Sequence, residues 1–477
     1  MNYRELVTAM TEPEKVDTIT LGAGGAAYPA AFALARAGQQ VVMVDPKGVM
    51  SGNCLAEGCV PSKAVYEVAE LYRRVTAAPM SRALGALTGP PDYAQVVAWK
   101  DQVQKDRYRQ HDGELQAASA NLRLVPGTGR LIDSHTVEVN TTGSAKRFQA
   151  AQIIIASGAD VFVPPIPGAQ LCVTSRDLFA LEPTVTSLPA RLAVIGGGYV
   201  GLEVACMLRA LGSQVTVIEA LPGLLAGMDP DFVTLLAAGI DPTISIQLSA
   251  SVTAVTKGDG GGFTVHYRIG DADSTVDADL VLMAVGRRPV IPDGATELGL
   301  PRAGHGLAVD VSMQVPGYPH LYAPGDVNGR SMLFHSAVRQ SLVAAHNILA
   351  GNRVVDRMDF DSVPATIFTA PQGAYVGLTR AKAAEQARQV VEAAYPMADD
   401  SRAQILGDTY GEIRLFCDAQ SLRLVGGWVV GADAAQLIGQ IGESVAAGLT
   451  AYDLARFADQ HPTAAEGIGK AARTLVG

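Results

Sequence analysis

Cysteine is scarce in this sequence, which has five cysteines among 477 residues, and long apolar runs are missing altogether. So few cysteines argue against a framework of structural disulfides of the kind found in exported proteins. No uncharged apolar run reaches the roughly 18 residues that span a bilayer, so no membrane helix is predicted. The segment 1–17 carries four acidic residues and lacks the apolar core of a signal peptide. We therefore expect a soluble, cytoplasmic protein.

Positive charge is also in deficit, because 37 lysines and arginines face 47 aspartates and glutamates, for a formal net charge of −10. A chain with this balance is not attracted to nucleic acid or to anionic membranes, and we expect neither as a partner. Apolar residues make up 48% of the chain and glycine occupies 50 positions, which suits α/β domains with sizeable cores. The length predicts about three domains.

Two of the few cysteines stand close together. Four residues separate Cys54 from Cys59, and an apolar-periodic segment, 64–72, follows and predicts a helix. Folding over the first helical turn brings such a pair within disulfide distance, and a helix N-terminus favours a thiolate. The spacing favours a redox-active pair, with two buried, inert cysteines as the alternative. An iron–sulfur site would need a further cysteine two or three residues on, and none follows, so no metal site is predicted.

The chain contains an internal duplication. Segments 21–45 and 195–219 align without a gap, and each contains a β run, a glycine turn, an amphipathic helix, a second β run and a closing acid. The small residues with dinucleotide-binding spacing are Gly22, Gly24 and Ala27 in the first copy and Gly196, Gly198 and Gly201 in the second. They permit a tight turn, approach of a pyrophosphate to a helix N-terminus, and helix–strand contact.

The closing acids complete both copies. Asp45 and Glu219 each lie 23 residues after the first glycine of their copy, where a carboxylate holds ribose hydroxyls. Two nucleotide sites in one chain indicate electron transfer between two cofactors. The second copy favours NAD over NADP, because a carboxylate repels a 2′-phosphate and no arginine follows Glu219 closely.

With these motifs in this order, the sequence resembles the class I pyridine nucleotide–disulfide oxidoreductases from about residue 17 to its C-terminus, and most closely their dihydrolipoamide dehydrogenase branch. The resemblance implies an α/β fold with two Rossmann-like dinucleotide-binding domains and a C-terminal α+β dimerisation domain. The implied bounds are an N-terminal extension at 1–17, an FAD-binding domain at 18–165, an NAD-binding domain at 166–284, a second FAD-binding or central part at 285–357, and an interface domain at 358–477.

The resemblance also assigns cofactor contacts. FAD is expected on the first copy, where Asp326 of a second motif holds the ribityl chain, and NAD on the second copy, where Tyr199 gates the nicotinamide pocket. The further cofactor-binding residues that it implies are Lys63, Gly129, Ser157, Gly158, Val252, Gly286 and Arg287.

Two charged pairs carry the implied catalysis. The resemblance implies that Lys63 and Glu203 form an ion pair beside flavin N5, although the residues alone favour a solvated lysine and a helix-surface glutamate. His461 and Glu466 resemble the closing dyad of the family, in which the histidine is the base for an incoming dithiol. In the family this histidine comes from the partner subunit, which implies a homodimer with shared active sites.

The expected function is an FAD enzyme that moves electrons between NAD and a dithiol, foremost dihydrolipoamide on a lipoylated carrier protein. The alternatives are a related disulfide reductase with another substrate, or a low-turnover flavoprotein that docks a lipoyl carrier. Ala27, Pro29 and Asp45 depart harmlessly from the family pattern. Ser51 and Ala56 replace its usual Gly and Asn in the cysteine loop, so we expect them to alter redox potential or partner choice. Cys172, Cys206 and Cys417 are interpreted as structural.

Overall fold

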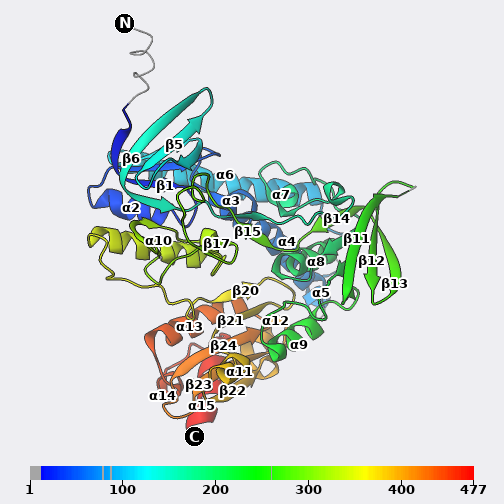
Figure 1. Cartoon of the computed structure of the whole chain (residues 1–477). Helices are drawn as coiled ribbons and strands as arrows, with labels where there is room; N and C mark the ends of the chain where they lie inside the picture. Colours follow the sequence, from blue (N-terminus) through cyan, green and yellow to red (C-terminus); the bar gives the residue numbers. More distant parts are fainter. Residues whose placement is uncertain (1–11, 78–79, 86–88, 259) are drawn as a thin grey trace.

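The computed structural model describes residues 12–77, 80–85, 89–258 and 260–477. Figure 1 shows the N-terminal third of the chain at one end, the C-terminal part at the opposite end, and the middle third to one side. Strand β1 (Glu14–Leu21) begins inside the segment 1–17 that the sequence predicted as an extension, while residues 1–11 of that segment lie outside the described residues.

A largely parallel sheet forms the core of the N-terminal part. Its strand order is β18 (Gln314–Val315), β19 (Tyr318–Tyr322), β6 (Ser144–Ile155), β1, β2 (Val41–Asp45) and β3 (Leu122–Pro126), and β5 (Thr136–Thr141) links β4 (Thr128–Leu131) to β6. Because β19 pairs with β6, the chain returns to this first sheet after it has built the middle part. Helix α2 (Tyr28–Arg36) buries an alanine-rich face and packs against α10 (Phe334–Leu349), where Ser341 Oγ accepts the Ala30 N–H at 3.0 Å.

The middle part repeats the arrangement on a smaller scale. Its parallel sheet has the order β10 (Ser245–Gln247), β9 (Gln214–Ile218), β8 (Arg191–Ile195) and β14 (Leu280–Met283), with α8 (Tyr199–Leu211) following β8. An antiparallel sheet of β11 (Ala250–Lys257), β12 (Phe263–Ile269) and β13 (Ala272–Ala278) stands at its outer edge (Figure 1). The chain enters through β7 (Ala159–Val161) and leaves through β15 (Arg287–Pro289), which pair as a two-stranded ribbon.

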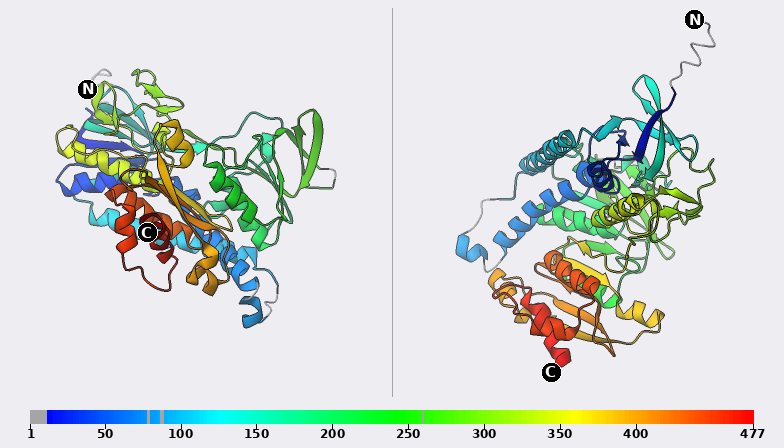
Figure 2. Two further views of the ribbon diagram at one scale, coloured as in Figure 1. Left: turned by 90° about the horizontal axis from the view of Figure 1, so that it is seen from below. Right: turned by 90° about the vertical axis from the view of Figure 1, so that its left-hand side faces the viewer.

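The C-terminal part is an antiparallel sheet covered by helices. The strand order is β20 (Ala365–Ile367), β21 (Gly373–Gly377), β24 (Leu424–Val430), β23 (Glu412–Asp418) and β22 (Val390–Pro396). The helices that pack on it include α13 (Ala434–Ala447) and α15 (Glu466–Val476), and α14 (Ala451–Arg456) packs on α15 (Figure 2). The predicted fold class is confirmed: two Rossmann-like units and an α+β unit.

One hydrophobic core joins the middle and C-terminal parts. Phe232 of α9 (Pro230–Gly239) is 1% exposed and lies edge-on to Trp428 and Tyr375, with ring centroids 5.9 and 6.0 Å apart. Tyr375 of β21 also lies beside Tyr199 at the start of α8, with the two hydroxyl oxygens 2.6 Å apart. Among the described residues, no helix is long and apolar enough to cross a membrane.

Candidate active site

The two neighbouring cysteines lie on successive helices. Cys54 belongs to α3 (Gly52–Glu57), and Cys59 is the first residue of α4 (Cys59–Thr76), so the helix starts five residues before the predicted segment. Both are free thiols. A hydrogen bond from Cys54, reinforced by the Lys63 cation, outweighs burial and lowers the pKa of Cys59 to about 7. The same hydrogen bond and burial raise the pKa of Cys54. Cys59 is therefore the thiolate of the pair, as its place at a helix N-terminus favours.

The other three cysteines differ from Cys59, and among the described residues none of them has a second cysteine as its hydrogen-bonding partner. Burial raises the pKa of Cys172 and of Cys417 to about 11 and that of Cys206 to about 12. Thiols with these values are protonated at neutral pH and do not act as nucleophiles. This contrast singles out Cys59, together with its hydrogen-bonded neighbour Cys54.

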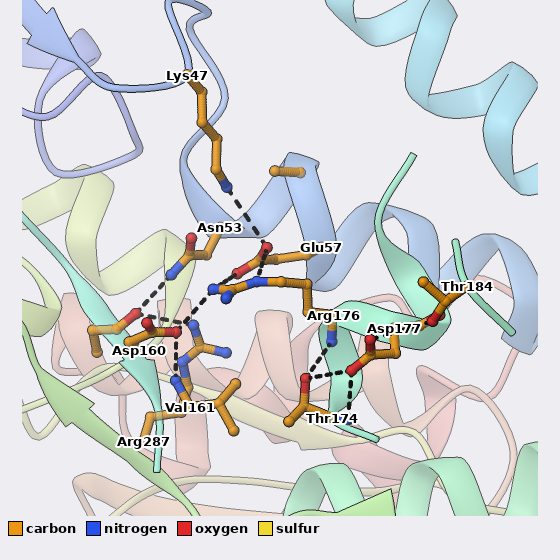
Figure 3. Close-up of polar contacts among 12 residues, drawn as sticks. Lys47, Asn53, Glu57, Asp160, Val161, Thr174, Arg176, Asp177, Thr184 and Arg287 are labelled. Carbon is orange, nitrogen blue, oxygen red and sulfur yellow. Dashed lines mark hydrogen bonds and ion pairs between the residues drawn. The ribbon is translucent and has the colours of Figure 1, made fainter. Parts of the chain in front are cut away.

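Helix α3 is tied at both ends to the ribbon that enters the middle part (Figure 3). At its start, Asn53 Nδ2 donates to the Ala159 carbonyl oxygen at 2.6 Å. At its end, the buried Glu57 carboxylate accepts two hydrogen bonds from Arg176 of α7 (Ser175–Phe179), at 2.8 and 3.0 Å, and Arg176 also donates to Asp160 at 2.9 Å. Although burial raises it, these bonds and nearby cations lower the pKa of Glu57, so it stays charged. The sequence prediction missed this clamp.

Helix α6 (Tyr93–Ala117) supports the cysteine loop from the other side. Gln104 Nε2 donates to the carbonyl oxygens of Leu55 and Ala56, both at 3.0 Å, and the buried Lys100 donates to Gln104 Oε1 at 2.8 Å. Burial lowers the pKa of Lys100. Residues 100 and 104 lie on one helix face. Two polar residues on the buried face of a helix are the sequence signal from which this support could have been predicted.

The predicted partners Lys63 and Glu203 are brought together from α4 and α8. Lys63 Nζ lies 2.7 Å from Glu203 Oε2, and Glu203 is 8% exposed. Glu203 Oε1 accepts the Phe368 N–H at 3.0 Å, and the lysine nitrogen lies 4.4 Å from the centre of the Phe368 ring. The pair thus connects the N-terminal, middle and C-terminal parts, and neither side chain is an ordinary solvated surface charge.

The first copy forms a tight cradle at the C-terminal end of β1. A Cβ at Gly22, which has a φ of +117°, would lie 2.3 Å from the Ala156 carbonyl oxygen, and one at Gly24 would lie 3.0 Å from the Gly52 Cα atom. Asp45 accepts the backbone N–H groups of Ala23 and Lys47. These residues fit the adenosine and pyrophosphate of FAD.

The other predicted FAD contacts surround this cradle. Burial raises the pKa of Asp326, and within the described chain its carboxylate accepts no hydrogen bond from the protein, as a group reserved for ligand hydroxyls would. Gly158 borders open space, whereas the Ser157 hydroxyl donates a hydrogen bond to the Val290 carbonyl oxygen at 2.5 Å. Gly129 packs against Leu21 on β1.

The second copy repeats the cradle at the end of β8. A Cβ at Gly201 would lie 2.0 Å from the Gly196 carbonyl oxygen, whereas Gly198 faces open space, which leaves room for a pyrophosphate. Glu219 accepts the N–H groups of Gly197 at 2.6 Å and Leu221 at 2.8 Å. These residues fit an NAD nucleotide.

The remaining predicted NAD contacts lie around this cradle. The Tyr199 hydroxyl meets the Tyr375 hydroxyl of β21 at 2.6 Å, and burial raises the pKa of Tyr199. Val252 lies beside a bulge in β11, two residues after Ala250, whose N–H binds the Glu219 carbonyl oxygen. Gly286 borders open space, and Arg287 donates to the Ala159 carbonyl oxygen at 3.0 Å, beside the cysteine helix.

His461 and Glu466 lie together at the C-terminal end of the molecule. His461 Nδ1 is 3.1 Å from Glu466 Oε1 at the start of α15, the imidazole is 66% exposed, and the carboxylate is buried. Burial raises the pKa of Glu466, but hydrogen bonds from His461 and Lys470 outweigh it and leave the pKa lowered. Figure 1 places α15 far from α3, so the chain does not bring this dyad to its own cysteines.

Two nucleotide cradles, a dithiol at a helix N-terminus and a separate histidine–acid dyad define a disulfide oxidoreductase that uses two nucleotide cofactors. The comparisons agree: the chain belongs to the pyridine nucleotide-disulphide oxidoreductase family, which residues 16–341 match, and residues 363–472 match the dimerisation domain of that family. It is a flavoprotein enzyme of class I that binds FAD and NAD(H) and forms a homodimer.

Two similar proteins carry the same name. The chain is 31% identical over 480 residues to the dihydrolipoyl dehydrogenase of Vibrio cholerae, covering 98% of this chain and 97% of that one. It is 30% identical over 468 residues to that of Geobacillus stearothermophilus, with 97% of each covered.

The solved structures that resemble this one are more varied. LpdA from Mycobacterium tuberculosis superposes with a TM-score of 0.87 at 25% identity, over 97% of this chain and 100% of that one. The HOCl-induced flavoprotein disulfide reductase RclA from Escherichia coli, at 24% identity and a TM-score of 0.83 over the same shares, shows the same fold.

Proposed function

We propose that the enzyme is an NAD-dependent dihydrolipoyl dehydrogenase that oxidises dihydrolipoamide on a lipoylated carrier protein in the cytoplasm. The observation that carries this proposal is the unequal pair of thiols: the pKa of Cys59 is lowered to about 7 while that of Cys54 is raised. One sulfur is thus suited to leave and remain as a thiolate, and the other to exchange with a substrate. The relatives named dihydrolipoyl dehydrogenase support the choice of substrate.

The exchange begins from the Cys54–Cys59 disulfide. His461 accepts a proton from one substrate thiol, the resulting thiolate bonds to the Cys54 sulfur, and Cys59 leaves as a thiolate. The second substrate thiol then attacks the mixed disulfide. The imidazolium gives its proton to the departing Cys54 sulfur, and the imidazole that this frees accepts the proton of the second thiol, while the product leaves as a cyclic disulfide. Two electrons and two protons thereby pass from the dithiol to the enzyme.

The two nucleotide cradles would hold the cofactors that receive those electrons. FAD, when bound, supplies the two-electron relay between the Cys59 thiolate and the nicotinamide. Lys63, held by Glu203 at 2.7 Å, places a fixed cation one helical turn after Cys59, where it stabilises negative charge. Glu219 holds the NAD ribose, and Tyr199 covers the nicotinamide pocket.

The geometry of the dyad supports a shared active site. His461 is exposed, and α15, which begins at its partner Glu466, lies far from α3 in the same chain (Figure 1), while the C-terminal part is a dimerisation domain. In a two-fold dimer, His461 of the partner subunit serves the cysteines of the first subunit, and the reverse holds for the second site.

Steady-state turnover tests the proposal. Purified holoenzyme should reduce NAD with dihydrolipoamide, and NADH should reduce glutathione disulfide or coenzyme A disulfide much more slowly. Cys54→Ser should abolish the dihydrolipoamide reaction. His461→Gln should reduce it by roughly 10²–10⁴-fold, the usual contribution of a positioned base. Fast turnover of another disulfide with little lipoamide activity would replace this assignment by a related reductase.

Subunit mixing tests the shared site. Inactive Cys54→Ser and His461→Gln subunits, once exchanged, give mixed dimers in which one site carries both residues intact. Random exchange should restore at most about a quarter of the wild-type activity per subunit. If mass spectrometry confirms mixed dimers and no activity returns, His461 does not serve the cysteines of the other subunit.

A further inference from the structure

The Glu466 carboxylate lies against two basic side chains, His461 and Lys470. Its Oε1 atom lies 3.1 Å from His461 Nδ1, and its Oε2 atom lies 3.1 Å from Lys470 Nζ, one turn further along α15. Lys470 stands four residues after Glu466, the spacing at which side chains of one helix face meet. The acid of the proposed dyad is thus divided between an imidazole and an ammonium group.

Lys470 is held in this position from a second element. Its Nζ atom lies 3.0 Å from the Tyr395 hydroxyl of β22, and that hydroxyl donates to the Asp399 carbonyl oxygen at 2.6 Å. The hydrogen bond with Tyr395 and, to a lesser extent, the Glu466 carboxylate raise the pKa of Lys470, although partial burial lowers it. The ammonium group therefore stays charged. A surface lysine left to solvent would lose this geometry to side-chain entropy.

Other charges on the elements packed against α15 are engaged elsewhere. Asp459, in the loop before His461, pairs with Arg473 at 3.2 Å. The further pairs are Asp453 with Arg456 on α14, Glu392 of β22 with Arg380 and Arg414, and Glu412 with Arg414 on β23, while Asp418 of β23 accepts from Ser421. Lys470 is therefore the cation that acts on Glu466 alongside His461.

We propose that Lys470 is a positioning residue that shares Glu466 with His461 and sets the pH range in which His461 works as a base. This inference rests on the proposed role of the dyad. A carboxylate that already neutralises an ammonium ion stabilises an adjacent imidazolium less than a free carboxylate does. Lys470 thus keeps His461 free of its proton, and able to accept one from a dithiol, at lower pH than a lone acid partner would allow.

The test is the pH dependence of kcat/KM for dihydrolipoamide. Lys470→Met leaves the whole carboxylate charge to His461, so the acid limb of the profile should move to higher pH, by about half to one unit. Lys470→Arg keeps the positive charge and should restore the wild-type limb. A shift in the opposite direction, or none, overturns the proposal.

Two further variants test whether the shift comes from the Lys470–Glu466 contact itself or from the loss of any positive charge on α15. Arg473→Met removes a positive charge from the same helix, but one that pairs with Asp459, so its acid limb should coincide with that of the wild type. Tyr395→Phe keeps the Lys470–Glu466 contact and should move the limb less than Lys470→Met. An equal shift in Arg473→Met would show that any lost cation suffices, and would overturn the assignment to Lys470.

A readout independent of turnover separates this inference from the proposed substrate. The imidazole C–H proton resonance of His461, assigned by its loss in His461→Gln, can be titrated in the intact holoenzyme dimer. Its midpoint should rise in Lys470→Met and not in Arg473→Met. If the midpoint rises while dihydrolipoamide is not turned over, the charge sharing stands and the substrate assignment fails. An unmoved midpoint refutes the charge sharing whatever the substrate.

Discussion

The two nucleotide cradles are built from the same backbone device. In the first copy, Asp45 accepts the N–H groups of Ala23 and Lys47, and in the second, Glu219 accepts those of the residues at the equivalent positions, Gly197 and Leu221. Each acid thus stabilises the glycine turn of its own copy through hydrogen bonds within the protein. This shared bonding explains why an aspartate and a glutamate both serve at the same position.

The copies differ at the start of the following helix. Pro29 stands near the start of α2, where a missing N–H costs little, and the equivalent position in α8 is Glu203, which pairs with Lys63. Likewise Gly25 in the first copy corresponds to Tyr199, which meets Tyr375. The first copy is therefore a binding cradle, whereas the second adds side chains that reach toward the redox site and the C-terminal part.

Among the substitutions that test this difference between the two copies, replacement of Glu203 should have the largest effect, on the free energy of unfolding. Glu203→Gln leaves the Lys63 ammonium without its anion in a largely buried place and sets a second donor against the Phe368 N–H. A broken buried ion pair costs about 3 kcal/mol of unfolding free energy. Urea unfolding of the holoenzyme, followed by circular dichroism, measures it.

The matched control lies in the same part of the molecule. Asp279→Asn makes the same carboxylate-to-amide change in the ion pair with Arg191, whose side chains are both more than a third exposed. Because solvent screens such exposed pairs, the free energy of unfolding should change little. Equal losses in the two variants would mean that Glu203 is no more important to the fold than a surface acid.

Local spacing made the cradles and the cysteine pair predictable from the sequence, and the resemblance to the family made the Lys63–Glu203 and His461–Glu466 pairs predictable. Other contacts left no such trace. The Glu57–Arg176 clamp joins residues 119 positions apart, and Gln104 supports α3 through backbone carbonyl oxygens that carry no side-chain signal. Lys470 is an intermediate case, because its four-residue spacing from Glu466 permits a contact on one helix face, but only the fold shows that His461 and Lys470 lie against the same carboxylate.

Substitution of the third small residue of each cradle, Ala27 in the first copy and Gly201 in the second, should have an intermediate effect on stability and on nucleotide binding. Gly201→Ala places a Cβ 2.0 Å from the Gly196 carbonyl oxygen, so the glycine turn must shift. Overpacking of this kind costs typically 1–3 kcal/mol, and the shift should raise KM for NAD at least tenfold. Ala27→Gly, the reverse change in the first copy, removes one buried methyl group and should cost about 1 kcal/mol.

The two variants should also differ in which cofactor they affect. Gly201→Ala should leave FAD content unchanged, and Ala27→Gly should leave KM for NAD unchanged, as measured by absorbance and steady-state kinetics. A Gly201→Ala enzyme with normal KM for NAD would show that the close helix–strand contact in the second copy is not required for binding.

The smallest effects should come from neutralising the two closing acids. Glu219→Gln keeps one acceptor oxygen but turns an NH₂ group toward one of its two backbone donors, which should weaken NAD binding by about 1 kcal/mol, or about fivefold. Because the amide no longer repels a 2′-phosphate, the preference for NAD over NADP should fall by a similar factor or more. Asp45→Asn makes the same change in the first copy and should increase FAD dissociation without altering NAD preference. Kinetics with both nucleotides and FAD release after dilution measure the two effects. An unchanged NAD preference in Glu219→Gln would show that the cradle geometry, and not the carboxylate charge, selects the nucleotide.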